Sequence, residues 1–283
     1  MELDPGTIFA YAADLLKEDI GRGDVTTQAT VRGGVRARGR FLAKEDFVLC
    51  GLEIAEAVFA ALDNSIQLES RFYDGDRIST STEFARIEGP ADVLLTGERT
   101  ALNLLQRLSG VATLTRAFVD RIEGTNARIV DTRKTTPGLR ALEKYAVTVG
   151  GGFNHRFGLD DGVLIKDNHI ALAGGVRRAI ELARSSVHHL MKIEVEVSSE
   201  AQLREAIEAR ADVIMLDNHS LEEIRRAVGL IREQAPGTII EVSGNVTIDT
   251  ARSVAECGVD LISVGAITHS ARAVDISLKI KPL

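Results

Sequence analysis

The chain has 283 residues, of which 45% are hydrophobic, and its formal net charge is -7. This length and apolar content are enough to bury a core in one large or two modest domains, and the acidic balance provides no general field for nucleic acid or an anionic membrane. The two cysteines, Cys50 and Cys257, share no metal-ligand spacing and predict no disulfide framework. The sequence also predicts no signal peptide and no apolar stretch near the roughly 20 residues of a membrane span. We therefore expect a cytoplasmic protein that binds neither nucleic acid nor membranes.

The first hundred or so residues mix predicted helices and strands. Asp4-Pro5 precedes apolar residues at helical spacing and predicts a capped amphipathic helix. Segments 35–49, 66–73 and 82–88 are predicted strands, and 51–62 is a predicted helix between them. Residues 97–123 predict a long helix that breaks near Ser109-Gly110, with an apolar stripe formed by Leu102, Leu105, Leu108, Val111 and Leu114.

Beyond residue 126, short apolar runs alternate with segments of helical spacing. Strand alternating with helix predicts parallel βαβ units and favours a (β/α) barrel with fewer than the usual eight strands. A doubly wound open sheet is the structural alternative. The apolar runs are residues 127–132, 162–167, 191–197, 211–217, 238–244 and 260–265.

Polar residues gather at the carboxyl ends of these predicted strands. In parallel α/β proteins the active site lies at that edge, whichever of the two topologies applies. The edge therefore predicts a functional site made of Asp131-Thr132-Arg133-Lys134, Lys166-Asp167-Asn168-His169, Glu196, Asp217, Ser243-Gly244-Asn245 and Gly265.

Four of the nearby cations predict that this site binds anions. Arg133, Lys134, Arg156 and Lys166 lie in or beside strand ends, and His155 precedes Arg156. One such residue alone would be read as a solvated or salt-bridged surface charge. Several converging cations are what carboxylates and phosphates need, because Arg can bind them through two hydrogen bonds.

Acidic and glycine-containing strand ends complete the predicted site. Strand alternation places Glu194 and Glu196 on one face, with Glu196 nearer the catalytic edge and Glu194 deeper. Glu196 and Asp217 could bind Mg²⁺ through water or hold ribose hydroxyls, or they could be buried acids paired with cations. Ser243-Gly244-Asn245 and Gly265 suit the approach of a phosphate to backbone N–H groups.

Other catalytic patterns are absent from the sequence. It has no Rossmann or P-loop glycine pattern, no GxSxG motif and no zinc spacing around His155 and His169.

One forty-residue run closely resembles the signature of the quinolinate phosphoribosyltransferases. The run is DTRKTTPGLRALEKYAVTVGGGFNHRFGLDDGVLIKDNHI, residues 131–170. Supporting matches span nearly the whole chain in the expected order, with no departure at a position that we consider essential. They are EDIGRGDVTT (18–27), GERTALNLLQRLSGVAT (97–113), EVEV (194–197), IMLDN (214–218), EVSGN (241–245) and SVGAITHS (263–270).

The resemblance implies a mixed α/β N-terminal sandwich domain over residues 1–110 and a barrel-like catalytic domain with six or seven parallel strands over 111–270. A tail, 271–283, is expected to pack back on the first domain. The resemblance also implies a homodimer, or a higher assembly of dimers, with shared active sites. Its implied substrates are quinolinate and phosphoribosyl pyrophosphate, and its implied cofactor is Mg²⁺.

The same resemblance assigns expected roles to individual residues. Lys134, Lys166, Glu196 and Asp217 are the expected catalytic residues, the latter two near ribose and Mg²⁺. Arg99 is expected to enter the partner's site, and His269 to lie near the pyrophosphate. The remaining expected substrate-binding residues are Thr132, Arg133, His155, Arg156, Ser243, Gly244, Asn245 and Gly265.

Three other functions remain as alternatives. The nearest is a phosphoribosyltransferase-like paralogue linked to molybdate uptake, which shares this fold and much of the signature. A nicotinate phosphoribosyltransferase would use a monocarboxylate without decarboxylation. A non-catalytic anion-binding protein on the same scaffold would have no need of Lys134, Lys166, Glu196 and Asp217.

Overall fold

The computed structural model describes residues 3–283, which form two compact units. The first unit comprises residues up to 116 together with 136–151 and 270–283. The second comprises residues 117–135 and 152–269.

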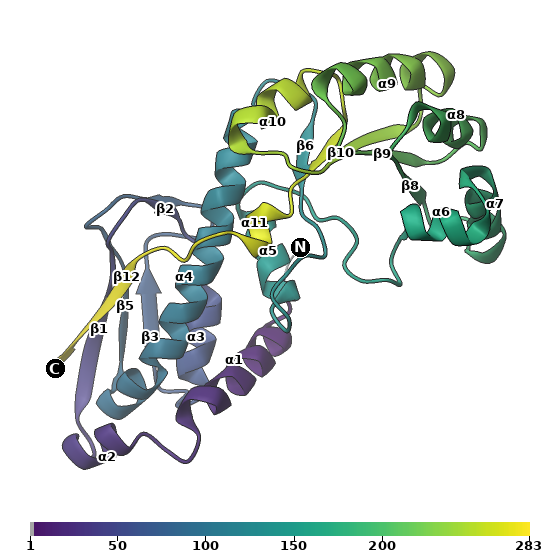
Figure 1. The fold of residues 1–283 in the computed structure, drawn as a ribbon. Helices are drawn as coiled ribbons and strands as arrows, with labels where there is room; N and C mark the ends of the chain where they lie inside the picture. The colour runs from purple at the N-terminus through teal and green to yellow at the C-terminus, as the bar shows by residue number, and fades with distance from the viewer. Residues whose placement is uncertain (1–2) are drawn as a thin grey trace. The chain divides into compact units, whose positions relative to one another are not determined.

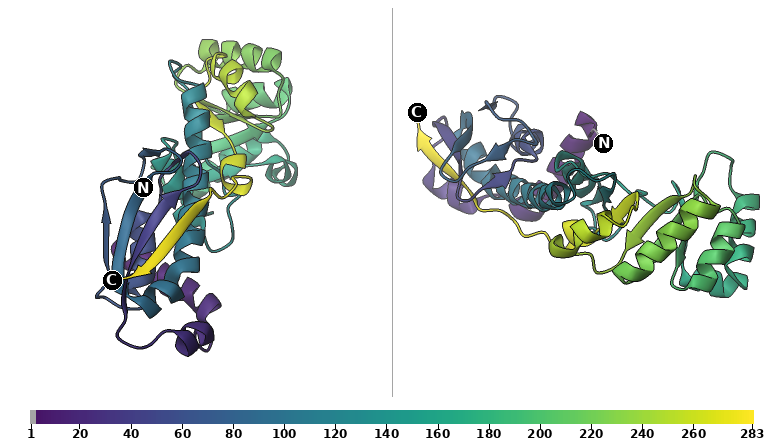
Figure 2. Two further views of the ribbon diagram at one scale, coloured as in Figure 1. Left: turned by 90° about the vertical axis from the view of Figure 1, so that its left-hand side faces the viewer. Right: turned by 90° about the horizontal axis from the view of Figure 1, so that it is seen from above.

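The first unit contains an antiparallel sheet with the strand order β12-β1-β5-β3. Its edge strand β12 comes from the end of the sequence and lies beside β1, as the left view of Figure 2 shows. The two strands pair over seven residues. A separate two-stranded ribbon pairs β2 with β4, so the segment predicted as one strand over 35–49 forms two. The strands are β1 (Arg36–Ala43), β2 (Phe47–Val48), β3 (Gln67–Ser70), β4 (Arg77–Ile78), β5 (Glu83–Pro90) and β12 (Ile276–Pro282).

The predicted first helix is confirmed. Asp4 caps it by accepting the backbone N–H of Thr7 at 2.9 Å, and Pro5 occupies the first helical position. The helices of this unit are α1 (Pro5–Ile20), α2 (Val25–Thr30), α3 (Leu52–Ala60), α5 (Arg140–Val149) and the part of α4 (Ala91–Arg121) up to residue 116.

The predicted helix break near Ser109-Gly110 is wrong, because α4 is continuous over 31 residues. Gly110 serves packing instead. A Cβ added there would lie 2.0 Å from the backbone carbonyl oxygen of Arg272, so only glycine permits this close approach. The hydroxyl of Ser109 donates to the carbonyl of Cys50 at 3.2 Å, which satisfies a buried polar group.

The second unit contains a parallel sheet of six strands in the order β6-β11-β10-β9-β8-β7. All six apolar runs form its strands. Consecutive strands from β7 to β11 are neighbours and β6 returns beside β11, which is the progression of a barrel and not the reversal of a doubly wound sheet. The strands are β6 (Arg128–Val130), β7 (Val163–Ile165), β8 (Ile193–Val197), β9 (Val213–Asp217), β10 (Ile239–Ser243) and β11 (Leu261–Ser263).

Helices follow the strands of this sheet and bury apolar faces. Figure 1 shows α7, α8 and α9 along the outside of the strands β8 to β10. The helices are α6 (Asp167–Ala173), α7 (Val176–Ser186), α8 (Glu200–Glu208), α9 (Leu221–Gln234), α10 (Ile248–Ala255) and α11 (Ala266–His269). Within residues 3–283, no helix combines the length and apolar character that a membrane crossing needs. Cys50 and Cys257 are buried and not joined in a disulfide.

Candidate active site

A cavity of about 680 Å³ opens at the carboxyl ends of the parallel strands of the second unit. Four cationic side chains and three carboxylic acids line it, so it can hold an anionic molecule and still offer acidic groups to a metal ion or hydroxyls. Its lining residues are Thr132, Arg133, Lys134, His155, Arg156, Leu164, Lys166, Glu196, Met215, Asp217, Asn218, Glu241, Ser243, Gly244, Asn245 and Ser263.

A buried aspartate fixes the segment that follows β6. Asp131 accepts the backbone N–H of His155 at 2.8 Å and the side-chain amide of Asn154 at 2.7 Å. These bonds stabilise the buried carboxylate and tie residues 154–156 to the end of β6. The hydroxyl of Thr268 donates to the carbonyl of Lys134 at 2.8 Å and fixes the other side of this loop.

Arg156 carries the signs of an anion-binding residue. One terminal nitrogen donates to the carbonyl of Gly162 at 2.9 Å, while Nε is buried without a hydrogen-bond partner in the described protein. Burial lowers the pKa of Arg156, and the nearby positive charge of Arg133 lowers it further. An anion bound between the two guanidinium groups would relieve both effects.

Lys166 and Glu196 form an ion pair across neighbouring strands. Lys166 follows β7, Glu196 lies on β8, and Nζ lies 2.6 Å from Oε2. The lysine side chain is 46% exposed, so it can also reach a ligand in the cavity. The glutamate side chain is 14% exposed and points to the same space.

A histidine and two buried glutamates form a cluster at the cavity, and two of the three, His155 and Glu241, line it. His155 Nε2 lies 3.0 Å from Glu194 Oε2 and 3.7 Å from Glu241 Oε2, while Nδ1 accepts the backbone N–H of Arg156 at 2.7 Å. The contacts therefore place the ring proton on Nε2. Burial, and next the negative charge of Glu194, raise the pKa of Glu241 to about 8, although His155 opposes the shift.

Two groups of side chains here could hold a metal ion. Glu196 and Asp217 end adjacent strands and offer carboxylate oxygens, which suit Mg²⁺. The second group is His155, Glu194 and Glu241, whose potential ligand atoms lie within 4.8 Å of one another. A hydrogen bond from His155 Nε2 to Glu194 Oε2 accounts for their contact without an ion.

Eleven of the expected site residues line this one cavity, and three do not. Gly265 lies next to Lys134 and His269: a Cβ at position 265 would be 3.1 Å from the Lys134 side chain and 3.2 Å from the His269 ring. The glycine therefore leaves room for the lysine. Arg99 is exposed on α4 in the first unit.

Sequence reasoning missed five of the lining residues, and two of these, Glu241 and Asn218, show why. The alternation used for Glu194 and Glu196 also applies to IIEVS, where it places Glu241 and Ser243 on one strand face. Strand alternation could therefore have predicted Glu241 as a residue of the site. Asn218 is different, because its position depends on contacts with the neighbouring strand end.

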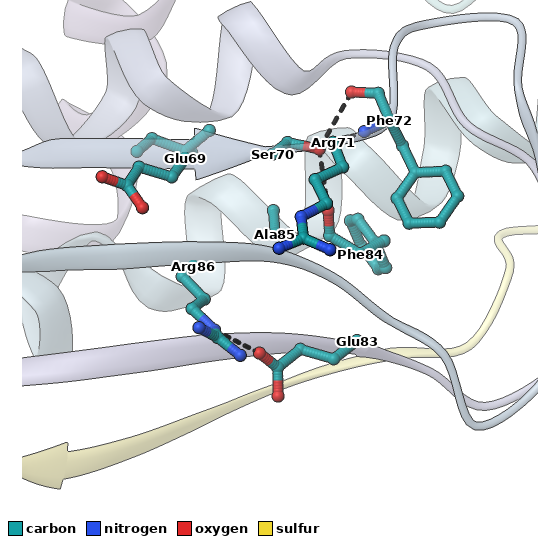
Figure 3. Close-up of a pocket in the computed structure, with 9 residues that line it drawn as sticks. Glu69, Ser70, Arg71, Phe72, Glu83, Phe84, Ala85 and Arg86 are labelled. Atoms are coloured by element: carbon teal, nitrogen blue, oxygen red, sulfur yellow. Dashed lines mark hydrogen bonds and ion pairs between the residues drawn. The ribbon is translucent and has the colours of Figure 1, made fainter.

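A second cavity, of about 710 Å³, lies in the first unit along β3 and β5 (Figure 3). Residues 68–72 and 83–86 line it. Glu83 is paired with Arg86, and the Ser70 hydroxyl lies 2.7 Å from the carbonyl oxygen of Phe84. None of these lining residues is a histidine, cysteine or lysine.

The chain is similar to known proteins over most of its length. Family models described as quinolinate phosphoribosyl transferase match residues 24–109 (N-terminal domain) and 111–279 (C-terminal domain). The chain is 46% identical over 264 residues to a probable nicotinate-nucleotide pyrophosphorylase [carboxylating] of Bacillus subtilis, covering 93% of this chain and 90% of the relative. It is 41% identical to quinolinate phosphoribosyltransferase [decarboxylating] 1b of Nicotiana tabacum, covering 94% and 80%. The crystal structure of NadC from Streptococcus pyogenes superposes with a TM-score of 0.95 at 42% identity, covering 100% and 99% of the two chains. The chain therefore belongs to the quinolinate phosphoribosyltransferase family.

Proposed function

We propose that the protein transfers the phosphoribosyl group of phosphoribosyl pyrophosphate to quinolinate, with release of pyrophosphate and carbon dioxide. The product is nicotinate mononucleotide, an intermediate of NAD biosynthesis. The observation that carries this proposal is the cavity in which Arg133, Lys134, Arg156 and Lys166 meet Glu196 and Asp217 at the strand ends. The molybdate-linked paralogue is not favoured by the names of the relatives.

The reaction needs positioned charge more than proton transfer. The pyridine nitrogen attacks C1 of the ribose as the bond to pyrophosphate breaks, and pyrophosphate leaves with the electron pair. The alkylated ring nitrogen is then positive and accepts electron density as the C2 carboxylate leaves as carbon dioxide, after which C2 takes up a proton. The protein's main tasks are to orient the two reactants and to stabilise the departing anion.

The cationic side chains suit these tasks. Arg133 and Arg156 form a pair of guanidinium groups whose mutual repulsion a bound dicarboxylate would relieve. Lys134 and Lys166 add point charges that can follow the pyrophosphate as it departs. No general base is required, because the nucleophile is the pyridine nitrogen itself.

Magnesium is part of the proposal. Glu196 engages Lys166 through Oε2, and Asp217 engages Asn218 through Oδ2, so each carboxylate can take another ligand through its second oxygen. Such a pair fits Mg²⁺, which commonly takes one or two carboxylates and completes its shell with substrate phosphates and water. Bound there, the ion would neutralise charge on the pyrophosphate.

A dimer with shared sites, or a higher assembly of such dimers, also belongs to the proposal. The family resemblance implies that Arg99 completes the cavity of a partner subunit. The exposure of Arg99 on α4 is compatible with that role. For location we propose the cytoplasm, where two cysteines without a disulfide are expected.

One turnover assay tests the proposed reaction. The purified protein is incubated with phosphoribosyl pyrophosphate, Mg²⁺ and either quinolinate or nicotinate, and carbon dioxide and nucleotide are measured. Quinolinate should yield equal amounts of carbon dioxide and nicotinate mononucleotide. Turnover of nicotinate alone, or of neither acid, would refute the proposal.

A further inference from the structure

Asn218 lies where two strand ends of the cavity meet. In the parallel register, Asp217 at the end of β9 is the partner of Ser243 at the end of β10. Asn218 extends that pairing by one residue, because its backbone N–H donates to the carbonyl of Ser243 at 3.0 Å. The residue is thus fixed at the boundary between the acidic strand end and the Ser-Gly-Asn segment.

The side-chain amide of Asn218 joins these two parts of the site. Its Nδ2 donates to Asp217 Oδ2 at 2.7 Å, and its Oδ1 accepts from Asn245 Nδ2 at 3.1 Å. Only one orientation of the amide satisfies both contacts, since a flipped amide would face oxygen with oxygen and nitrogen with nitrogen. An asparagine is therefore suited to this position in a way that neither aspartate nor a hydrophobic residue is.

The backbone at residues 218 and 244–245 has conformations that accommodate the Asn218 side chain. Asn218 and Asn245 both have left-handed backbone conformations, with φ of 55° and 51°. A Cβ added at Gly244 would lie 2.3 Å from Asn218 Oδ1 and 3.0 Å from its backbone nitrogen. Gly244 therefore has a role besides access for a phosphate: it leaves space for the Asn218 amide.

We infer that Asn218 is a positioning residue that aligns Asp217 with the 243–245 segment, and so acts on the phosphoribosyl donor and not on quinolinate. The inference rests on the proposed function, with Asp217 near the ribose and Mg²⁺ as the family resemblance implies. It also takes the phosphate expected at Ser243, Gly244 and Asn245 to be the 5′-phosphate of the donor. Asn218 would thus hold the groups that bind the ribose and the groups that bind the 5′-phosphate at a fixed distance from each other. Within residues 3–283, the hydrogen bonds of its amide go to Asp217 and Asn245 and to none of the cationic side chains assigned to quinolinate.

The test replaces Asn218 with glycine, which accepts a φ of 55° without strain and removes both side-chain hydrogen bonds. We expect kcat/KM for phosphoribosyl pyrophosphate to fall about ten- to hundredfold, since one of the lost bonds is to a charged group. The dissociation constant of quinolinate, titrated without the donor, should stay within about twofold of wild type, because the substitution removes none of the contacts assigned to quinolinate. Asn218→Asp keeps the acceptor for Asn245 but sets a carboxylate against Asp217, and should lose at least as much.

Arg210→Gly is the matched control. Arg210 also has a left-handed backbone, with φ of 54°, but precedes β9 at the opposite end of the strand from Asp217. Its replacement should leave both substrates unaffected. If Asn218 served only the backbone conformation, Asn218→Gly would retain wild-type kinetics, and that result would overturn the inference. An equal loss in quinolinate binding and donor kinetics would overturn it as well. A wild-type protein that fails to turn over quinolinate would overturn the proposed function along with the inference.

Discussion

The substitution Glu241→Gln tests whether the carboxyl group of Glu241 is protonated in the folded protein. Burial and the charge of Glu194 raise the pKa of Glu241 from 4.5 to about 8 in the folded protein. Between these values the folded protein binds a proton that the unfolded chain releases, so the contribution of this group to stability is greatest at low pH and is lost as pH rises toward 8. The loss amounts to about 1.4 kcal/mol per pH unit.

Glutamine has the shape of the protonated glutamic acid and no such pH dependence. From pH 6 to pH 7.5, the stability of Glu241→Gln relative to wild type should therefore rise by about 2 kcal/mol. Urea unfolding of both proteins at four pH values in that range measures the difference, in which titrating groups that do not interact with residue 241 cancel. Glu233→Gln, at an exposed position of the same unit, is the control for the loss of one acidic side chain. A stability difference for Glu241→Gln that does not change with pH would mean that Glu241 is ionised throughout, and would contradict the prediction.

Three further predictions concern the proposed reaction. Because four cations line the cavity, quinolinate should bind about ten- to hundredfold more tightly than nicotinate in calorimetric titration, which is roughly the contribution of one charge-assisted hydrogen bond. Equal affinities would contradict the role of these cations in binding a dicarboxylate. Chelation with EDTA should abolish turnover but leave quinolinate binding largely intact. Glu196→Gln should lower kcat/KM for phosphoribosyl pyrophosphate more than it weakens quinolinate binding. Undiminished activity in metal-free buffer would exclude the assignment of Mg²⁺. Arg99→Ala and Lys166→Ala should each be nearly inactive, yet a mixture should recover about a quarter of wild-type activity if subunits pair at random into two-site dimers. An inactive mixture, with subunit exchange confirmed by mass spectrometry, would rule out a role of Arg99 across subunits.

The sequence was sufficient to predict the parallel strands and the edge where the cavity lies. Six apolar runs with polar ends are a local signal, and strand alternation correctly placed Glu196 toward the cavity. The resemblance to a known family supplied the proposed chemistry, which composition and spacing alone left open.

What the sequence could not show depends on contacts between distant segments. The helix break predicted at Gly110 was wrong because the reason for that glycine is the Arg272 carbonyl, far away in sequence. The function of the Asn218 amide likewise depends on Asn245, and the raised pKa of Glu241 depends on Glu194 on another strand. Local propensity contains no information about such partners.

The pairing of β12 with β1 has a consequence for synthesis on the ribosome. The two strands are more than two hundred residues apart, so at typical elongation rates roughly 10 to 50 seconds separate their appearance. During that time β1 has β5 on one side and an open edge on the other, which is a template for pairing with another chain. The second unit is translated in the interval. We therefore expect nascent chains that end before residue 276 to need protection from aggregation, and the first unit to be completed last although its synthesis begins first.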